Sequence, residues 1–476
     1  MQIKLPLPVI KILQTLEKKG FEVYVVGGAV RDLMMGIGKI RDWDFTTNAT
    51  PKQILSLFNE SFYDNNFGTV MVASEHIGEQ FKLKIDEEEY EVFDITTFRK
   101  EYGYTDKRRP DKIEWGKTIE DDLGRRDFTA NAIALKITNY KLQETNKSKI
   151  ANLKYQTVKA EVIDPYEGQK DLEQKLIHAV GDANERFNED ALRMIRAIRL
   201  GAQLGFQIEK KTLEAIQKNV QLITHISWER IGDEFMKILS SDFPADGVTL
   251  LYSAGLLTFV MPELPQMREV PQGGHHIYDV WKHSIESLRE CPSTDPVVRL
   301  ATLLHDIGKP KTMKKQGPRG VTFYGHEVVG TKMAREIGKR LRLSKKQIMK
   351  LKILVRWHMF NYDPKMTDAA IRRFIKRVGK ESINDMMLLR VGDRKGGGSK
   401  ATSWRLREFQ QRIGEQLYEP LSVSDLKIDG KDVMKELKLK PGPKVGEILN
   451  TLFEEVMEDT SKNEKEYLLK RVKELG

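Results

Sequence analysis

Residues 21–46 read FEVYVVGGAVRDLMMGIGKIRDWDFT, and this stretch decides the fold of the first part of the chain. Its first six residues are mostly apolar and β-branched, which predicts a buried strand that ends at Gly27-Gly28. A helix is expected over 29–35 and a second strand over 43–46. Paired glycines before a helix N-terminus let backbone N–H groups approach a phosphate closely, so this turn is a candidate phosphate cradle.

Two acidic residues, Asp42 and Asp44, flank Trp43 on the second predicted strand. Because side chains alternate along a strand, both carboxylates would point to one face and Trp43 to the other. Paired carboxylates beside a phosphate cradle suit two-metal nucleotidyl transfer, in which one cation activates the attacking 3′-hydroxyl and the other holds the triphosphate. Asp94 alternates with apolar neighbours and is either a third such carboxylate or an acid at a strand end.

Residues 189–199, Glu-Asp-Ala-Leu-Arg-Met-Ile-Arg-Ala-Ile-Arg, predict a helix with a charge at every third position. On one helix, Asp190 and Arg193 would project together. A carboxylate accepts from the exocyclic amine of cytosine or adenine, and a guanidinium donates to the adjacent ring nitrogen, whereas uracil and guanine present the opposite pattern. The pair would therefore select C and A without a template; the alternative is an ion pair on a solvated helix.

Three motifs follow one another in order: residues 26–32 (Val-Gly-Gly-Ala-Val-Arg-Asp), 42–44 (Asp-Trp-Asp) and 125–132 (Arg-Arg-Asp-Phe-Thr-Ala-Asn-Ala). Together they resemble the bacterial-type (class II) tRNA nucleotidyltransferases and their poly(A) polymerase relatives. The resemblance implies an α+β, polymerase-β-like head with a mixed sheet and helices, followed by an all-α remainder. It also implies that Asp42 and Asp44 are catalytic ligands of Mg²⁺, that ATP and CTP are bound, and that the acceptor is the 3′ end of tRNA.

The same resemblance implies the nucleotide contacts: Gly28, Arg31 and Arg126 at the phosphates, Asp127 at the ribose, Asp190 and Arg193 at the base, and Arg196 and Arg199 near the triphosphate. In this family a loop at 98–110 is associated with the change from C to A addition, so its presence favours A addition. Residues 65–70 read Asn-Asn-Phe-Gly-Thr-Val instead of the Gly-Arg-Arg-Phe-type signature of poly(A) polymerases. CCA addition is therefore favoured; an A-adding enzyme and a poly(A) polymerase remain alternatives.

A second group of residues, typical of a metal site, lies farther along the chain: His283, His305, Asp306, His326, His358 and Asp393. Their order resembles the HD phosphohydrolase superfamily. The resemblance implies core ligands for a divalent transition metal or Mg²⁺ at His283, His305, Asp306 and Asp393, with His326 and His358 serving a second metal or the phosphate. Phosphatase and 2′,3′-cyclic phosphodiesterase activities are expected, although such a domain could bind a metal without catalysis. His275 and His276 are expected to be ordinary loop histidines.

Length and composition limit the number of domains and the cellular location that can be expected. A chain of 476 residues predicts about three or four domains: a head over 1–160, a neck and body over 161–268, an HD domain over 269–395 and a helical tail over 396–476. The lone Cys291, the lack of a signal sequence and the lack of a long apolar run favour the cytoplasm and no membrane.

The net charge of +10 favours a polyanionic partner, and no protein partner is evident. Phosphate contacts are expected from the basic pairs 210–211, 372–373 and 376–377, and from a helix–hairpin–helix turn over 439–446. A rival interpretation from another class is an HD phosphohydrolase whose head has become an RNA-binding module. The intact Asp42, Asp44, Asp190 and Arg193 argue against it.

Overall fold

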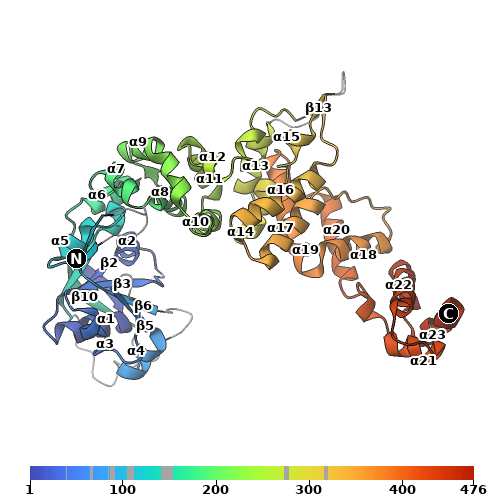
Figure 1. The fold of residues 1–476 in the computed structure, drawn as a ribbon, viewed down its shortest axis with the longest axis horizontal. Coiled ribbons are helices and arrows are strands. Elements are labelled where there is room, and N and C mark those ends of the chain that lie inside the picture. The colour runs from blue at the N-terminus through green and yellow to red at the C-terminus, as the bar shows by residue number, and fades with distance from the viewer. Residues whose placement is uncertain are drawn as a thin grey trace. The chain divides into compact units, whose positions relative to one another are not determined.

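A computed structural model describes residues 1–38, 40–64, 68–83, 85, 92–103, 112–140, 154–272, 278–315 and 320–476. The residues 65–67, the part 104–110 of the predicted loop, and His275-His276 therefore lie outside the described residues. The chain divides into two compact units (Figure 1). Unit 1 comprises residues 1–234 and 250–259, and unit 2 comprises residues 235–249 and 260–476.

Unit 1 is built on an eight-stranded mixed sheet. Its strands, in spatial order, are β1 (Gln2–Pro6), β10 (Tyr155–Ile163), β9 (Ala134–Asn139), β2 (Val23–Val26), β3 (Trp43–Thr47), β6 (Val92–Thr97), β5 (Thr69–Ala73) and β4 (Phe62–Asp64). The neighbours β3 and β6 are parallel, and the other neighbouring pairs of this sheet are antiparallel. The expected mixed sheet of a polymerase-β-like head is thereby confirmed.

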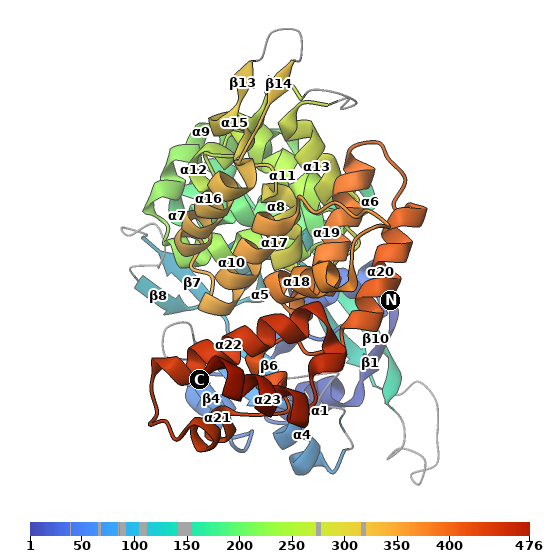
Figure 2. The ribbon, with the colours of Figure 1, turned by 90° about the vertical axis from the view of Figure 1, so that its right-hand side faces the viewer.

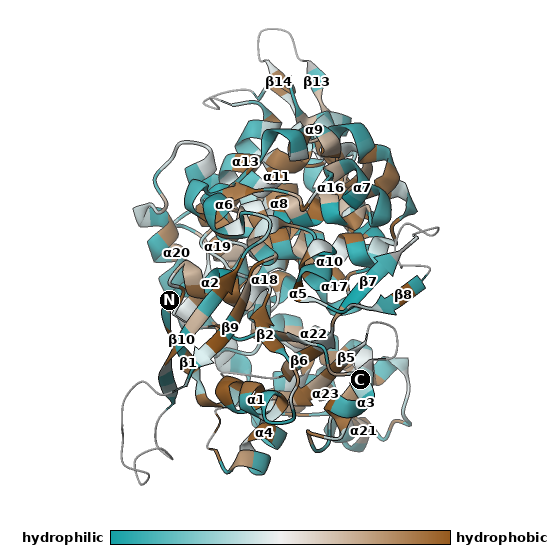
Figure 3. Cartoon of the chain, turned by 90° about the vertical axis from the view of Figure 1, so that its left-hand side faces the viewer, coloured by the Kyte–Doolittle hydropathy of each residue, from teal (hydrophilic) through white to brown (hydrophobic). Residues whose placement is uncertain are grey.

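The core of unit 1 lies between this sheet and the helices that cover it. Strand β2 is buried at every position, because its Val-Tyr-Val-Val run has apolar partners on both faces. Helices α1 (Leu7–Glu17), α3 (Pro51–Leu55) and α4 (Ser74–Phe81) contribute buried residues to the larger cluster. Figure 3 shows apolar residues along α1 and β2 and hydrophilic ones along β7 (Arg99–Tyr102).

A group of helices completes unit 1: α2 (Gly28–Met34), α5 (Ile119–Gly124), α6 (Gly168–Gln174), α7 (Ala183–Glu189), α8 (Leu192–Leu204) and α9 (Lys210–Asn219), with α10 (Trp228–Ser240) beginning in it. The prediction of a helix that already includes Glu189-Asp190 is wrong in one respect. Asp190 is extended, at φ −139° and ψ 105°, and separates α7 from α8. The physical reason is local: the Asp190 Oδ1 accepts from the Leu192 N–H at 3.0 Å, which favours a turn over a continuous helix.

Unit 2 is helical except for one short strand pair, as far as the structure describes it. Its main helices, all but α14 labelled in Figure 2, are α13 (Val280–Arg289), α14 (Pro296–Leu304), α16 (His326–Arg340), α17 (Lys345–Trp357), α18 (Asp368–Val378), α19 (Ile383–Gly396), α20 (Trp404–Gln416), α21 (Gly430–Leu437), α22 (Pro443–Glu458) and α23 (Lys465–Leu475). Helices α13, α14, α16, α17 and α19 pack together. The described helices include none long and apolar enough to cross a membrane.

One predicted phosphate contact does not fit its position in the structure. Arg372 is 4% exposed, and its guanidinium donates to the carbonyls of Met457 and Glu458 and to Gln416. Because the last carbonyls of a helix lack intrahelical partners, this arginine satisfies the C-terminus of α22. The surface role expected for Arg372 is therefore wrong. The neighbouring Lys376 pairs with Glu454 at 3.2 Å.

Candidate functional site

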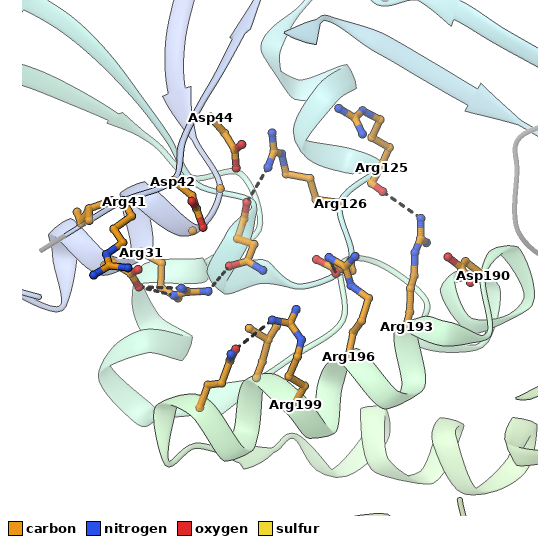
Figure 4. A pocket seen from close by; sticks show the side chains of 18 of the residues that line it. Arg31, Arg41, Asp42, Asp44, Arg125, Arg126, Asp190, Arg193, Arg196 and Arg199 are labelled. Carbon is orange, nitrogen blue, oxygen red and sulfur yellow. Dashed lines mark hydrogen bonds and ion pairs between the residues drawn. The ribbon is translucent and has the colours of Figure 1, made fainter. Parts of the chain in front are cut away.

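A cavity of about 880 Å³ in unit 1 is lined by all ten residues that the sequence predicts for the head. These are Gly28, Arg31, Asp42, Asp44, Arg126, Asp127, Asp190, Arg193, Arg196 and Arg199. Figure 4 shows the acids Asp42 and Asp44 at one end of the cavity and Asp190 at the other, with the arginines of α8 between them. The cavity is thus long and strongly polar, which suits a nucleoside triphosphate.

The Gly-Gly turn and Asp44 are in direct contact. Gly27 has a φ of +75°, and a Cβ built on it would lie 2.7 Å from the Asp44 Oδ2. A side chain at Gly27 would therefore be strained by the backbone and would also displace the carboxylate. The antiparallel pairing of Val26 with Asp44 fixes this approach.

The acidic end of the cavity holds the carboxylates of Asp42 and Asp44. Asp44 lies on β3 and Asp42 just before the strand begins. Burial raises the pKa of Asp44; Arg126 opposes this shift and Asp42 adds to it. Asp94 on β6 is the parallel-strand partner of Asp44, and its pKa is raised to about 6 by burial and by the charges of Asp44 and Asp42. Asp94 itself is not among the residues that line the cavity.

The arginines near these acids are held by other side chains. Arg126 donates to the Asp122 Oδ2 at 3.2 Å, and Arg125 donates to the Asp122 Oδ1 at 2.7 Å. Asp122 lies on α5 and is fully buried, so its carboxylate holds both guanidinium groups in place. Arg31 pairs with Asp32 and donates to Asn131 Oδ1 at 2.9 Å.

The two predicted base-reading residues line the same cavity but each has another partner. Arg193 Nη1 lies 2.5 Å from the Glu189 Oε2, and its Nη2 donates to the backbone carbonyl of Arg125 (Figure 4). Asp190 pairs with Arg230, at 2.7 Å between Oδ2 and Nη2. The prediction that Asp190 and Arg193 are neighbours three apart on one helix is therefore wrong, since Asp190 precedes α8.

The remaining arginines of α8 are paired with acids. Arg196 Nη2 lies 2.7 Å from the Asp127 Oδ2, and Arg199 Nε lies 2.6 Å from the Glu234 Oε2. Burial raises the pKa of Asp127, but the charges of Arg196, Arg193 and Arg199 outweigh it and hold that pKa below its usual value. Asp127 is therefore an anion among arginines at neutral pH.

Several lining residues were missed by the sequence analysis: Arg41, Arg99, Glu101, Arg125 and Arg230. Arg125 stands beside Arg126 in the third motif, so its position was a usable signal. Arg99 and Glu101 lie on β7, the near end of the predicted loop. Arg230 is 40 residues from Asp190, and nothing in its neighbourhood in the sequence points to the site.

A second cavity, of about 850 Å³, lies in unit 2 and is lined by all six predicted residues of the histidine–aspartate set. Their ligand atoms form two groups, His283 with His305 and Asp393, and Asp306 with His326 and His358. The Asp306 Oδ2 lies 3.2 Å from the His305 Nε2, and its Oδ1 lies 3.3 Å from the His326 Nε2. Asp306 thus faces both groups with one oxygen each.

The histidines of this cavity are oriented by backbone carbonyls. The Nδ1 atoms of His305, His326 and His358 lie 2.6–2.9 Å from the carbonyls of Thr302, Phe323 and Val355. A carbonyl only accepts, so each Nδ1 donates and each Nε2 points inward, where it carries a lone pair whenever the ring is neutral. Burial and the charge of His305 lower the pKa of His358 to about 3, which keeps that ring neutral. Inward lone pairs and carboxylates together fit a divalent cation.

Comparison with known proteins agrees with the geometry of the first cavity. Residues 23–178 match the family model "Poly A polymerase head domain", residues 205–267 match "Probable RNA and SrmB- binding site of polymerase A", and residues 328–472 match "tRNA nucleotidyltransferase domain 2 putative". The crystal structure of the Bacillus stearothermophilus CCA-adding enzyme in complex with CTP has a similar fold, with a TM-score of 0.70 at 24% identity over 99% of this chain and 98% of that one.

Two relatives match over most of their length. The A-adding tRNA nucleotidyltransferase of Deinococcus radiodurans is 32% identical over 90% of each chain. The CCA-adding enzyme of Ligilactobacillus salivarius is 30% identical over 98% of this chain and 95% of its own. Motifs, cavity and relatives agree, and this chain therefore belongs to the tRNA nucleotidyltransferase family that includes the CCA-adding and A-adding enzymes.

Proposed function

We propose that this chain adds CMP and AMP to the 3′ end of tRNA without a nucleic-acid template, using CTP and ATP. The observation that carries the proposal is the shared cavity, in which Asp42 and Asp44 and the predicted base-reading residues Asp190 and Arg193 line one space. The names of the relatives support it, since full-length matches at about 30% identity are CCA-adding enzymes.

The acidic end of the cavity fits a hard divalent cation. Asp42 and Asp44 offer only oxygen donors, and burial raises the pKa of Asp44, a shift that a bound cation would oppose. A cation such as Mg²⁺ bound there would lower the pKa of the attacking 3′-hydroxyl and neutralise charge on the leaving pyrophosphate. Members of this family use a divalent metal; the choice of Mg²⁺ and its ligands Asp42 and Asp44 are part of the proposal.

The residues of the chain would bind and orient the nucleotide. Gly28 offers a backbone N–H without a side chain in the way, and Arg31 and Arg126 bring positive charge beside it. Arg196 and Arg199, on the same face of α8, would bind the triphosphate between the acids and the base. Asp127, already ionised and paired with Arg196, would accept from a ribose hydroxyl.

The far end of the cavity would select the base. The Asp190 carboxylate would accept from the exocyclic amine of cytosine or adenine, while the Arg193 guanidinium would donate to the adjacent ring nitrogen. Uracil or guanine would place a carbonyl against Asp190 and an N–H against Arg193. An unmatched buried polar group costs about 1–3 kcal/mol, so two mismatches reject the wrong base strongly.

Addition of single nucleotides tests the proposal. A tRNA ending at the position before CCA is incubated with each labelled nucleotide, then with CTP and ATP together. We expect C from CTP alone, and A only after two C residues are present.

A second candidate is an A-adding enzyme, favoured by the 32% identity to the Deinococcus radiodurans protein. It would extend only a tRNA ending in CC, whereas long A tails would identify a poly(A) polymerase.

The second cavity supports a second proposed activity, hydrolysis of a phosphate ester. Three oriented histidines and the shared Asp306 suit a divalent transition metal or Mg²⁺, which would supply activated water at neutral pH. Lys309, which donates to the Asp306 Oδ2 at 2.6 Å, lines the cavity together with Arg390 and Arg394. Cationic side chains at the wall can contact the phosphate of an anionic ester. Assays with phosphomonoesters and 2′,3′-cyclic nucleotides, with and without added metal, test this activity.

The proposed arrangement of domains follows the sequence. The head over 1–160, the neck and body over 161–268, the HD domain over 269–395 and the tail over 396–476 remain proposals, as does the contact of the tail with tRNA. The match of residues 205–267 to a family model described as a probable RNA-binding site supports an RNA contact near the neck. The expectation of a cytoplasmic location is likewise a proposal.

A further inference from the structure

Arg230 holds the carboxylate of Asp190 from a different helix. Asp190 lies between α7 and α8, whereas Arg230 lies on the first turn of α10. The guanidinium binds in a two-point manner, with Nη2 2.7 Å from Oδ2 and Nη1 3.3 Å from Oδ1. Both side chains line the cavity, and they are only 14% and 24% exposed. Arg230 thus contacts the carboxylate to which the proposed function gives the reading of the base amine.

The hydrogen bonds of Asp190 leave a defined vacancy. A carboxylate has about four acceptor positions, two on each oxygen. The Oδ1 accepts from the Leu192 N–H at 3.0 Å and from Arg230, whereas the Oδ2 accepts from Arg230 at 2.7 Å. Among the described residues, one acceptor position of the Oδ2 therefore has no protein donor, and the geometry of Arg230 determines its direction. An exocyclic amine of cytosine or adenine carries the donor that this vacancy needs.

The two base-reading groups are each paired with another residue. Asp190 and Arg193 have opposite charges and line one cavity, so each is a potential partner of the other. Arg193 is paired instead with Glu189, at 2.5 Å between Nη1 and Oε2. Asp190 is paired instead with Arg230. If these outer partners were lost, a direct Asp190–Arg193 pair could form and consume the hydrogen-bonding groups that face the base.

We propose that Arg230 is a positioning residue for nucleotide selection, which aims the free acceptor of Asp190 at the base amine and prevents Asp190 from pairing with Arg193. The inference rests on the proposed base-reading function of Asp190. Arg230 acts through Asp190 and does not itself contact the reacting atoms. Its loss therefore changes which nucleotide is chosen more than how fast the chemistry proceeds.

The test compares nucleotide selection in full-length variants. For Arg230→Ala we expect kcat/KM for CTP to fall roughly 10- to 100-fold, the range that a lost charge-assisted hydrogen bond at a buried group produces. For UTP we expect little change, so the preference for CTP over UTP falls by a similar factor. Inhibition by inorganic tripolyphosphate should be unchanged, because the phosphate-binding residues remain. Arg230→Lys should be intermediate, since an ammonium pairs with one oxygen only.

A matched control removes an arginine from a comparable pair elsewhere. Arg340 pairs with Glu263 in unit 2 in the same two-point manner, at 2.8 and 2.7 Å and with similar exposure (24% and 20%), outside both cavities. Arg340→Ala should leave the CTP-to-UTP preference as in the unmodified protein. If Arg230→Ala destabilises the chain, Arg230→Lys still reports selection, because it retains the charge. An equal loss of activity with CTP and UTP in the Arg230 variants would overturn the proposal.

A double-mutant cycle separates this inference from the function on which it rests. Asp190→Ala should reduce the CTP-to-UTP preference, and adding Arg230→Ala to it should produce no further reduction. A further, independent reduction would show that Arg230 contacts the base directly and would overturn the positioning role. If Asp190→Ala leaves selection unchanged, the proposed base-reading function itself fails. If Asp190→Ala changes selection but Arg230→Ala and Arg230→Lys do not, the inference about Arg230 fails and the base-reading function of Asp190 stands.

Discussion

Asp44 and Asp94 are register partners on the parallel strands β3 and β6, so their carboxylates leave the sheet side by side on one face. Burial and the charges of Asp44 and Asp42 raise the pKa of Asp94 to about 6. The sequence left Asp94 open between a third carboxylate of the site and an acid at a strand end. Because Asp94 is the third of the six residues of β6, it does not end the strand, and its place beside Asp44 agrees with the first interpretation.

The acidic end of the cavity leads us to expect a variant that loses nucleotide addition but keeps hydrolysis of phosphate esters. Asp42→Ala should reduce nucleotide incorporation into tRNA on the order of 1000-fold or more, which corresponds to about 4 kcal/mol of transition-state stabilisation. The reason is that an oxygen donor at the cation position is removed. Hydrolysis of phosphate esters by unit 2 should persist in the same preparation. Incorporation close to that of the unmodified chain would contradict the assignment of Asp42.

Asp122 predicts a pH-dependent contribution to stability. Burial raises its pKa, but the charges of Arg125 and Arg126 outweigh this and hold the pKa below the usual 3.8. A carboxyl with a lowered folded-state pKa stabilises the fold above the unfolded-state value, and this contribution is lost as the pH falls through the folded-state pKa. Asp122→Asn should therefore cost about 3–5 kcal/mol at pH 7, the usual effect of breaking a buried ion pair.

Denaturant unfolding at pH 7 and at pH 3 measures this effect. The difference in the free energy of unfolding between the unmodified chain and Asp122→Asn should shrink at the lower pH. A difference that stays constant between the two conditions would show that Asp122 is not ionised in the folded chain.

The second cavity predicts that one residue serves both groups of ligands. Asp306 faces His305 with one oxygen and His326 with the other, so Asp306→Ala should remove metal from both groups. Metal content by mass spectrometry should fall from that of the unmodified chain to background, and hydrolysis of phosphate esters should fall with it. Addition of nucleotides to tRNA by the same variant controls for folding. Retention of metal at half the original content would show that the two groups bind independently.

Arg372 predicts a loss of stability instead of a loss of RNA affinity. Its guanidinium satisfies the carbonyls of Met457 and Glu458 at the end of α22. Arg372→Ala would leave the buried carbonyl of Met457 unpaired, at about 1–3 kcal/mol, and would also release the partly buried carbonyl of Glu458. Thermal unfolding should shift to lower temperature, and tRNA affinity measured well below that transition should be unchanged. If a fully folded Arg372→Ala variant bound tRNA more weakly, the phosphate contact expected from the sequence would be supported instead.

The head site was predictable because its motifs are local. Gly27, Gly28 and Asp44 are brought together by one strand pair that the apolar run 21–26 already indicates. Asp190 was placed on the wrong element, since a three-residue charge rhythm does not reveal that its side chain takes the Leu192 N–H and separates two helices. Arg230 could not be found at all, because it reaches Asp190 from another helix, α10, 40 residues farther along the chain.

The histidine–aspartate set illustrates the same limit. The order of the six residues predicted one site, and the structure brings all six to one cavity. The sharing of Asp306 between two groups depends on how α14, α16 and α17 pack, which residue order alone does not contain. The carbonyls that orient the histidine rings were also beyond a sequence-based prediction, since they depend on the turn that precedes each ring.

The most direct test of the account measures nucleotide choice in the unmodified chain and in Asp190→Ala. The acceptor is a tRNA that lacks its terminal CCA, and kcat/KM is determined separately for CTP and UTP. The unmodified chain should prefer CTP strongly, and Asp190→Ala should lose roughly 10- to 100-fold of that preference while still binding tripolyphosphate. An unmodified chain that incorporates UTP as well as CTP, or a variant that discriminates as well as its parent, would contradict the account.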